Sequence, residues 1–239
     1  MIYLGGKTRQ GIKISRFLNA LIARDPDNRP YYEPFVGAGG VLWRIEAPAG
    51  RFATDLNPDI IQLWKALQEG WIPPEKVTFR DWVRLQDAEP SPERTFAGFG
   101  CSAYGLWFHK YAHNRNDKVA SAAKISGRQI LTRAAKCEDV EFAVLDYRDL
   151  DPPPGAVIYC DPPYERAKVN FFPNTDSEDF NWVEFWAWAE ALTRRGCFVY
   201  VSSYSAPPKW KSAVTVSTAP GWYSSGAQKG AEFLFRLAV

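Results

Sequence analysis

The stretch GAVIYCDPPYERAKV, residues 155–169, decides how the chain folds around its candidate site. The residues before Asp161 form an apolar run that is typical of a buried strand, and Pro162 and Pro163 cannot continue it because proline lacks the N–H that a sheet needs. The carboxylate of Asp161 is therefore expected at the carboxyl end of a strand. A stiff turn then holds Tyr164 at a fixed offset, so we expect this tetrapeptide to present its groups to a ligand.

The hydrophobic periodicity on either side of this stretch predicts an α/β fold with a doubly wound, mostly parallel sheet. Residues 10–25 and 181–196 predict helices, and residues 51–70 predict a strand, a turn and a helix capped by Asn57. A strand and glycine turn over 31–40 are expected to continue as a helix over 40–47. Further strands are predicted at 140–147, 155–164, 197–205, 213–218 and 232–239. The mostly helical part, 71–136, is interpreted as a domain inserted into a sheet domain formed by 1–70 and 137–239.

Composition limits the classes of protein that fit. The chain has 239 residues, of which 46% are hydrophobic, so it is long enough for one large domain with a full core. Its four cysteines lie far apart without partner histidines, which predicts neither a zinc site nor a disulfide framework. No segment approaches the length of a membrane span. These features predict a soluble, cytoplasmic protein without a metal or a membrane partner.

Charge is distributed unevenly along the chain. Residues 101–136 contain seven Lys/Arg and one acidic residue, a net charge of +6, whereas the rest of the chain carries −4. Aromatic residues alternate with the cations there, which suits unpaired nucleic-acid bases. A solvated helix face is the alternative for the charges, and some of the rings must belong to the core.

A glycine turn and three acidic residues are expected at one edge of the sheet. Gly37 and Gly39 lie in EPFVGAGG, where a backbone turn can approach a ligand closely, and Asp55, Asp146 and Asp161 each follow a predicted strand. Asp55 lies 18 residues beyond Gly37, near the spacing at which an acid meets ribose hydroxyls in dinucleotide folds. An adenosine-containing cofactor is indicated, with an ordinary tight turn as the alternative.

The motifs YLGGK, EPFVGAGG, DLN (55–57), DY (146–147) and DPPY (161–164) occur in an order that resembles Dam-like DNA adenine methyltransferases, and GFGCSAYGLWFHKYAHNR resembles their phage-type members. The resemblance implies a Rossmann-like methyltransferase fold, S-adenosylmethionine as cofactor and double-stranded DNA as partner. It implies that the catalytic residues are Asp161, Pro162, Pro163 and Tyr164. The implied cofactor-binding residues are Lys7, Glu33, Pro34, Phe35, Gly37, Gly39, Asp55, Asn57, Asp146, Tyr147 and Asp161.

The chemistry of DPPY agrees with methyl transfer to adenine. The exocyclic amine is a poor nucleophile, and the carboxylate of Asp161 and the carbonyl of Pro162 can accept its hydrogens while Tyr164 stacks on the base. A stacked base cannot reach a cofactor in a cleft, so the adenine must flip out of the duplex. The basic insertion is expected to hold the DNA. Its candidate contacts are Lys110, Asn114, Arg115, Lys118 and Arg128.

Several alternatives remain open at the level of sequence. N4-cytosine methylation uses the same geometry, although its tetrapeptide more often begins with Ser, and RNA adenine methylation is a further option. A non-catalytic DNA-binding protein could retain the fold, and a nicotinamide oxidoreductase is disfavoured by the missing third glycine and by DPPY. The recognition sequence is open, because GATC is only the commonest target of the family. So is the presence of a cognate restriction enzyme.

Overall fold

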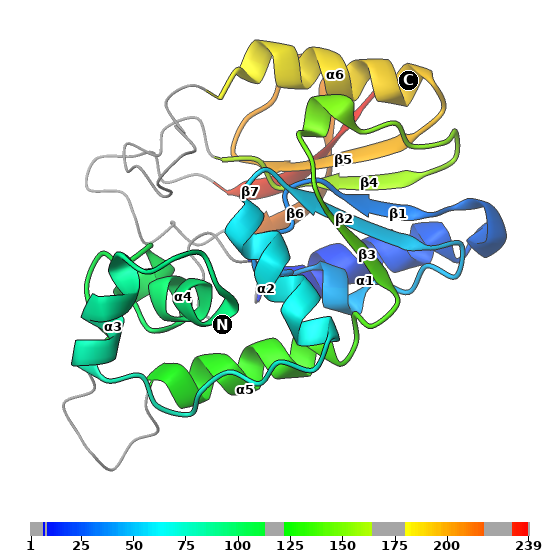
Figure 1. Ribbon diagram of the computed structural model, residues 1–239. Coiled ribbons are helices and arrows are strands. Elements are labelled where there is room, and N and C mark those ends of the chain that lie inside the picture. The colour runs from blue at the N-terminus through cyan, green and yellow to red at the C-terminus, as the bar shows by residue number, and fades with distance from the viewer. Residues whose placement is uncertain (1–6, 8, 113–121, 164–179, 218–230, 239) are drawn as a thin grey trace.

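The computed structural model of the chain contains a seven-stranded sheet with helices on both faces (Figure 1). The structure describes residues 7, 9–112, 122–163, 180–217 and 231–238. The strands run in the order β3-β2-β1-β4-β5-β7-β6, with β1 to β5 parallel and β7 antiparallel to both of its neighbours. They are β1 Tyr31–Glu33, β2 Arg51–Asp55, β3 Val140–Val144, β4 Val157–Cys160, β5 Phe198–Ser203, β6 Trp210–Ser217 and β7 Glu232–Leu237. The predicted doubly wound, mostly parallel α/β fold is confirmed.

The order of the strands fixes where a ligand would bind. The chain goes from β1 to β2 on one side and later returns to place β4 on the other side of β1. This reversal is the topological switch point of the sheet, and ligands of doubly wound folds bind outside the carboxyl ends of the strands there. The carboxyl ends of β1, β2 and β4 are therefore the expected location of the site.

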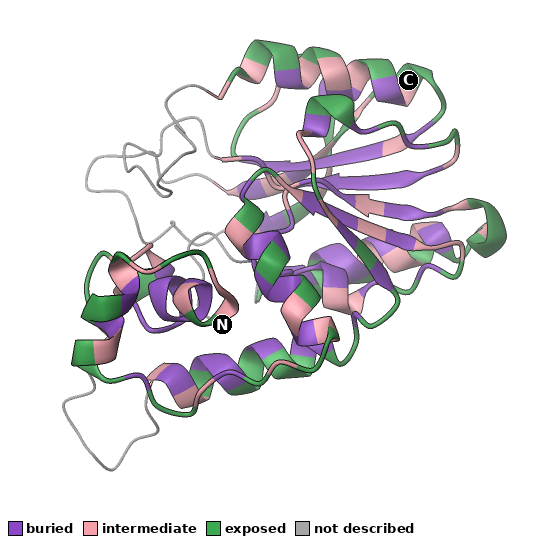
Figure 2. Cartoon of the chain, viewed as in Figure 1, coloured by how far each residue is buried: buried purple, intermediate pink, exposed green. Residues whose placement is uncertain are grey.

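Helices α1 (Gly11–Ile22) and α2 (Pro58–Gln68) cover one face of the sheet, and α6 (Trp182–Arg194) covers the other (Figure 1). Every residue of β4 is buried, and alternate residues belong to different cores. Val157 and Tyr159 join the cluster that contains α1 and α2, whereas Ile158 and Cys160 pack with α6. The apolar run before DPPY is thus a central strand with both faces covered, as Figure 2 shows by its colour.

The predicted helix ends at 57 and 181 are confirmed. The side chain of Asn57 accepts a hydrogen bond from the backbone N–H of Asp59 at 3.0 Å, and Asn181 accepts one from Glu184 at 3.1 Å. Both are amide side chains that satisfy free N–H groups in the first turn of a helix. Pro58 occupies the first helical position after Asn57, where its missing N–H has no cost.

The predicted helix over 40–47 is wrong. Only a 3₁₀ turn forms, Leu42–Arg44, and Ile45 is already extended with φ −84° and ψ 133°. Pro48 follows three residues later and disfavours a helical conformation at the residue before it, which leaves no room for a second helical turn. The segment instead returns the chain quickly from the glycine turn to the start of β2.

The helical part of the chain packs beside the sheet rather than apart from it (Figure 1). It contains α3 (Phe79–Gln86), α4 (Pro92–Thr95), a π-helical turn (Phe96–Gly100) and α5 (Ala122–Ala134). Trp82, Phe99 and Ile130 from these elements belong to the same hydrophobic cluster as α2. The assignment of residues 71–136 to a separate DNA-reading domain stays a prediction. Among the described residues, no helix is long and apolar enough to span a membrane.

Candidate active site

Three buried or half-buried carboxylates lie at the carboxyl edge of the sheet, the edge formed by the ends of β1, β2 and β4. Glu33 ends β1, Asp55 ends β2 and Asp161 follows directly on β4. Because β1 pairs in parallel with both β2 and β4, these three side chains emerge from neighbouring strands at one end of the sheet. The acids at 55 and 161 that the sequence predicts at this edge are found there.

The glycine turn packs too closely for side chains. Gly39 has φ +61°, and a Cβ atom there would lie 2.7 Å from the ring of Trp64. A Cβ atom on Gly40 would lie 2.8 Å from the backbone nitrogen of Lys7. The indole N–H of Trp64 also donates to the carbonyl oxygen of Gly37 at 2.9 Å. Lys7 thus packs against the glycine turn, and Trp64 of α2 holds the turn from the other side.

Asp55 is held by the turn that follows β1. Its carboxylate accepts hydrogen bonds from the backbone N–H of Gly37 at 2.9 Å and from that of Asn57 at 3.0 Å. Burial raises the pKa of Asp55 to about 6, although both hydrogen bonds act in the opposite direction. Each oxygen retains a further lone pair, so the carboxylate is oriented and can still accept hydrogen bonds from a ligand.

Glu33 is more deeply buried, with 3% of its surface exposed. The hydroxyl of Tyr31 donates to its Oε2 atom at 2.6 Å. Burial raises the pKa of Glu33 to about 8, and the nearby charge of Asp161 raises it further against the effect of the Tyr31 hydrogen bond. Glu33 is therefore mostly protonated at neutral pH, so it can donate a hydrogen bond as well as accept one.

Asp161 shares a buried ammonium group with a residue from the far end of the chain. The Nζ atom of Lys7 lies 2.9 Å from Oδ1 of Asp161 and 2.9 Å from Oε1 of Glu232. Lys7 and Glu232 are each 4% exposed, and Asp161 is half-buried. The two carboxylates raise the pKa of Lys7 even though burial, the largest single effect, lowers it. The resemblance implies that Lys7 reaches a cofactor carboxylate; the structure pairs it with these two acids.

Asp146 and Tyr147 lie beside an aromatic cluster. The Tyr147 ring packs 5.5 Å from Phe35 and 5.6 Å from Phe185, measured between ring centroids. The carboxylate of Asp146 accepts hydrogen bonds from the backbone and guanidinium of Arg148, which lower its pKa. The resemblance implies that Phe35 and Tyr147 both contact the cofactor, and this stays a prediction. Pro34 lies between the buried Glu33 and Phe35 and is itself buried.

The basic segment, residues 101–136, is less uniform than its composition indicates. Lys110 and Arg128 are exposed, as expected for DNA contacts. Arg133 is buried instead, and its Nη1 atom donates to the carbonyl oxygen of Ala38 at 2.6 Å, while burial lowers its pKa to about 10. This guanidinium attaches α5 to the glycine turn and is not available to a polyanion.

The aromatic residues of the same segment divide in the same way. The Trp107 ring packs against Phe99 at a centroid distance of 4.7 Å, and the Phe108 ring packs against Trp82 at 5.4 Å. Tyr104, in contrast, is 59% exposed and has φ +62°. The predicted residues Asn114, Arg115, Lys118 and Tyr164 lie outside the described residues.

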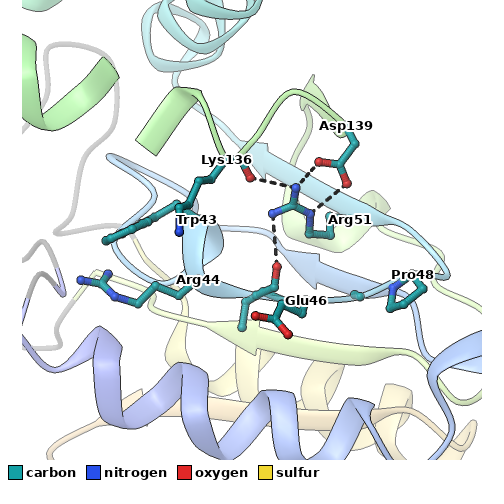
Figure 3. Close-up of a pocket in the computed structure, with 9 residues that line it drawn as sticks. Trp43, Arg44, Glu46, Pro48, Arg51, Lys136 and Asp139 are labelled. Atoms are coloured by element: carbon teal, nitrogen blue, oxygen red, sulfur yellow. Dashed lines mark hydrogen bonds and ion pairs between the residues drawn. The ribbon is translucent and has the colours of Figure 1, made fainter. Parts of the chain in front are cut away.

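A cleft of about 660 Å³ lies away from the carboxyl edge (Figure 3). Arg51 begins β2 and Asp139 precedes β3, so the cleft is at the amino ends of these strands. The guanidinium of Arg51 is bound by the carboxylate of Asp139 and by the carbonyls of Ile45 and Lys136. This arrangement closes the strand ends and is structural. Within the ranges that the structure describes, no group of three metal-ligating side chains occurs, and the four cysteines are free and buried.

The strand order and the carboxyl edge define the class: an α/β protein with a doubly wound, mostly parallel sheet. Residues 3–88 match the family described as D12 class N6 adenine-specific DNA methyltransferase, a range that contains Lys7, the glycine turn and Asp55. The match confirms the resemblance to Dam-like DNA adenine methyltransferases. It supports an adenine-specific DNA methyltransferase enzyme, whose substrate is DNA and which requires a methyl donor.

Two solved structures align with the chain at low similarity. One is yhhF from Escherichia coli, provisionally described as a methyltransferase, with 11% identity, a TM-score of 0.37, and 95% of this chain and 86% of that chain covered. The other is HI0767 from Haemophilus influenzae, provisionally described as a methylase, with 13% identity, a TM-score of 0.39, and 95% and 97% covered. Scores at this level carry no argument about function. No curated protein matches the chain.

Three residues of the edge did not follow from the sequence. Glu232 starts an apolar strand and belongs to none of the motifs, so only its position as the one acid of EFLFRLAV sets it apart. Arg148 directly follows the DY motif, and a cation next to an expected carboxylate is a weak signal for pairing. Trp64 had no signal beyond its place on the apolar face of α2.

Proposed function

We propose that the protein transfers a methyl group from S-adenosylmethionine to the N6 amine of an adenine flipped out of duplex DNA. The observation that carries this proposal is the position of Asp161. Its carboxylate follows a buried central strand at the switch point of the sheet, at the same edge as the glycine turn after β1 and Asp55 at the end of β2. The match of residues 3–88 supports the choice of adenine as the base.

The residues at this edge fit S-adenosylmethionine. The amino-acid part of the cofactor is assigned to the turn after β1, which the close packing of Gly39 and Gly40 against Trp64 and Lys7 keeps tight. Asp55 is fixed by two backbone N–H groups with lone pairs left for ribose hydroxyls. The rings of Phe35 and Tyr147 provide an apolar surface beside Asp146 for the adenine ring. When bound, the sulfonium cofactor supplies an activated methyl group that needs no metal.

The protein groups act on the substrate amine. Lys7 binds the Oδ1 atom of Asp161 and orients the carboxylate, which can accept a hydrogen from the base. The carbonyl of Pro162, directly after it, is a second acceptor with no N–H of its own to compete. Two acceptors on the amine hydrogens increase electron density on nitrogen as it attacks, a stabilisation that is greatest in the transition state.

DNA binding is proposed for the exposed part of the basic segment. Lys110 and Arg128 are exposed cations in a stretch of net charge +6, and Tyr104 exposes an aromatic ring among them. Cations of this kind neutralise phosphates, and an aromatic ring offers a stacking surface for a base. Contacts with the backbone can offset the few kcal/mol that base flipping costs.

The direct test is a methylation assay with product identification. We would incubate the purified chain with duplex DNA and S-adenosylmethionine labelled in its methyl group, digest the DNA and separate the nucleosides. The proposal expects the label in N6-methyl-2′-deoxyadenosine. Label in N4-methylcytosine would establish the alternative base, and cofactor binding without transfer to any base would indicate a non-catalytic protein. Sequencing of methylated DNA would then give the recognition sequence.

A further inference from the structure

The clearest feature that the proposed chemistry leaves unexplained is Glu232. It is the first residue of β7, it is 4% exposed, and its carboxylate binds the same ammonium group as Asp161. A buried carboxylate is costly unless it is paired, and a hydrophobic residue would be the usual choice at the start of an interior strand. The sheet instead brings residues 7, 161 and 232 from distant parts of the sequence to one point.

Two carboxylates share one ammonium in this cluster. Lys7 stays protonated because both carboxylates raise its pKa. Without Glu232, Lys7 and Asp161 would form a neutral pair, and the ammonium would neutralise much of the charge of the Asp161 carboxylate. Glu232 takes a share of the ammonium, so Asp161 keeps more of its capacity to accept hydrogen bonds.

Four further titratable groups of the described residues face Asp161. Glu33 on β1, Tyr159 and Cys160 on β4 and Tyr204 after β5 face Asp161, and burial raises the pKa of each one. These four groups are therefore mostly neutral near pH 7. Asp161 is paired with the charged Lys7 and, through Lys7, is coupled to Glu232.

We propose that Glu232 is a positioning residue for methyl transfer: it divides the charge of Lys7 and thereby keeps Asp161 a strong acceptor for the substrate amine. Glu232 touches Lys7 rather than the reacting atoms, so its effect reaches the reaction through Lys7 and Asp161. This inference rests on the proposed function, in which Asp161 accepts a hydrogen from the base.

The first experiment uses Glu232→Gln in the full chain, because glutamine keeps the shape and an oxygen for Lys7 but removes the charge. We expect kcat for DNA methylation to fall about tenfold, with the dissociation constant for S-adenosylmethionine within about twofold of wild type. The acid limb of the kcat–pH profile should move to lower pH, because loss of a neighbouring negative charge lowers the pKa of Asp161. Glu190→Gln is the matched control, since Glu190 also binds two cations but lies on α6.

The results that overturn the proposal are specific. An unchanged kcat would remove Glu232 from the reaction. A fall in kcat with an unmoved acid limb and a matching loss in melting temperature would mean that Glu232 only stabilises the fold. A Glu232→Asp variant should recover part of kcat, because it restores the charge.

A double-mutant cycle tests the route through Lys7. If Glu232 acts through Lys7, Glu232→Gln should have little further effect on kcat in a Lys7→Met background, whereas independent effects would multiply. Multiplying effects would contradict the route. If Lys7→Met does not fold, the pH profile of Glu232→Gln decides the proposal without it.

One measurement separates this inference from the proposed function. The carboxyl carbon of Asp161 can be titrated by nuclear magnetic resonance in wild type and in Glu232→Gln, without substrate. We expect a lower pKa for Asp161 in the variant, and an equal pKa would overturn the inference even if wild type methylates adenine. If wild type shows no methyl transfer while the pKa falls as expected, the proposed function fails and the charge coupling stands.

Discussion

The carboxyl edge of the sheet and the basic segment hold their polar side chains in different ways. At the edge, the carboxylate of Asp55 is fixed by backbone N–H groups of the neighbouring turns, and Asp161 is fixed by a buried lysine. In the basic segment, Lys110 and Arg128 extend from the surface, whereas Arg133, only five residues beyond Arg128, is buried against the glycine turn. Position along a strand thus predicts which acids lie at the edge, whereas the net charge of a segment does not predict which of its cations are exposed.

The largest expected effect is at the edge. Asp161→Asn keeps the size of the side chain and leaves Lys7 paired with Glu232, but it removes the charge that accepts the amine hydrogen. We expect methyl transfer to fall by about 10²- to 10³-fold, as when one preorganised group is removed from a transition state. The affinity for S-adenosylmethionine should change little. Single-turnover kinetics and calorimetry measure the two quantities.

Asp151→Asn is the control for this variant, because Asp151 is 82% exposed and pairs with Arg195 at the surface. It should leave both quantities unchanged. Near-normal turnover of Asp161→Asn would show that the carboxylate takes no part in the mechanism. The position of an acid at the carboxyl edge would then not predict a catalytic role.

The positions of Asp55 and Asp161 at the edge were predictable from the sequence because each lies at the carboxyl end of a predicted strand. Asp55 and Asp161 needed only that local pattern and the rule that parallel strands end at the same side. Glu232 needed the antiparallel pairing of β7 with β5, which is set by packing over the whole sheet. The expected helix over 40–47 failed because periodicity alone did not take account of Pro48.

The basic segment was less predictable for a physical reason. Trp107, Phe108 and Arg133 satisfy the same compositional pattern as Tyr104 and Arg128, but the first three fill the core shared with α2 or bind the glycine turn. The helices there are too short for a clear hydrophobic period, and the π-helical turn at Phe96–Gly100 changes which residues lie on the same helical face. Burial had to come from the structure.

The second prediction tests the exposed cations. Replacing Lys110 and Arg128 together with Ala should reduce the slope of log affinity against log salt by about 0.9 for each phosphate that is no longer neutralised. If each of the two cations neutralises one phosphate, DNA affinity near physiological salt should fall about 30-fold. Fluorescence anisotropy with labelled duplex over a salt series gives both values, and cofactor affinity should be unchanged.

A control removes the same charge elsewhere. Arg24 and Lys209 are exposed cations of the sheet region, and their joint replacement with Ala should leave the salt slope at the wild-type value. An equal loss of affinity in both double variants would mean that the basic segment contributes only to the overall charge.

A smaller effect is expected for the cofactor contact at Asp55. Asp55→Asn should weaken S-adenosylmethionine binding about tenfold, because hydrogen bonds to a charged acceptor contribute roughly 1.5–3 kcal/mol. The wild-type pKa of about 6 lies above the ordinary value, so the carboxylate gains a proton as pH falls through 6. Affinity should therefore decrease between pH 7.5 and pH 5 in wild type and stay nearly constant in Asp55→Asn, as calorimetry at each pH can show. A pH-independent wild-type affinity would exclude Asp55 as the ribose acceptor.

The smallest expected effect is at Tyr104, an exposed aromatic residue of the basic segment. Its backbone is in the left-handed region at φ +62°, which costs a tyrosine about 1–2 kcal/mol relative to glycine, and its side chain is 59% exposed. Such strain is retained where the side chain serves a ligand. Tyr104→Gly should therefore keep or raise the melting temperature while DNA affinity falls about fivefold, the low end of base stacking. Tyr104→Phe keeps the ring and should bind DNA normally. If Tyr104→Gly instead lowers the melting temperature and leaves DNA affinity intact, the ring supports the fold, and only the cations of the basic segment face the DNA.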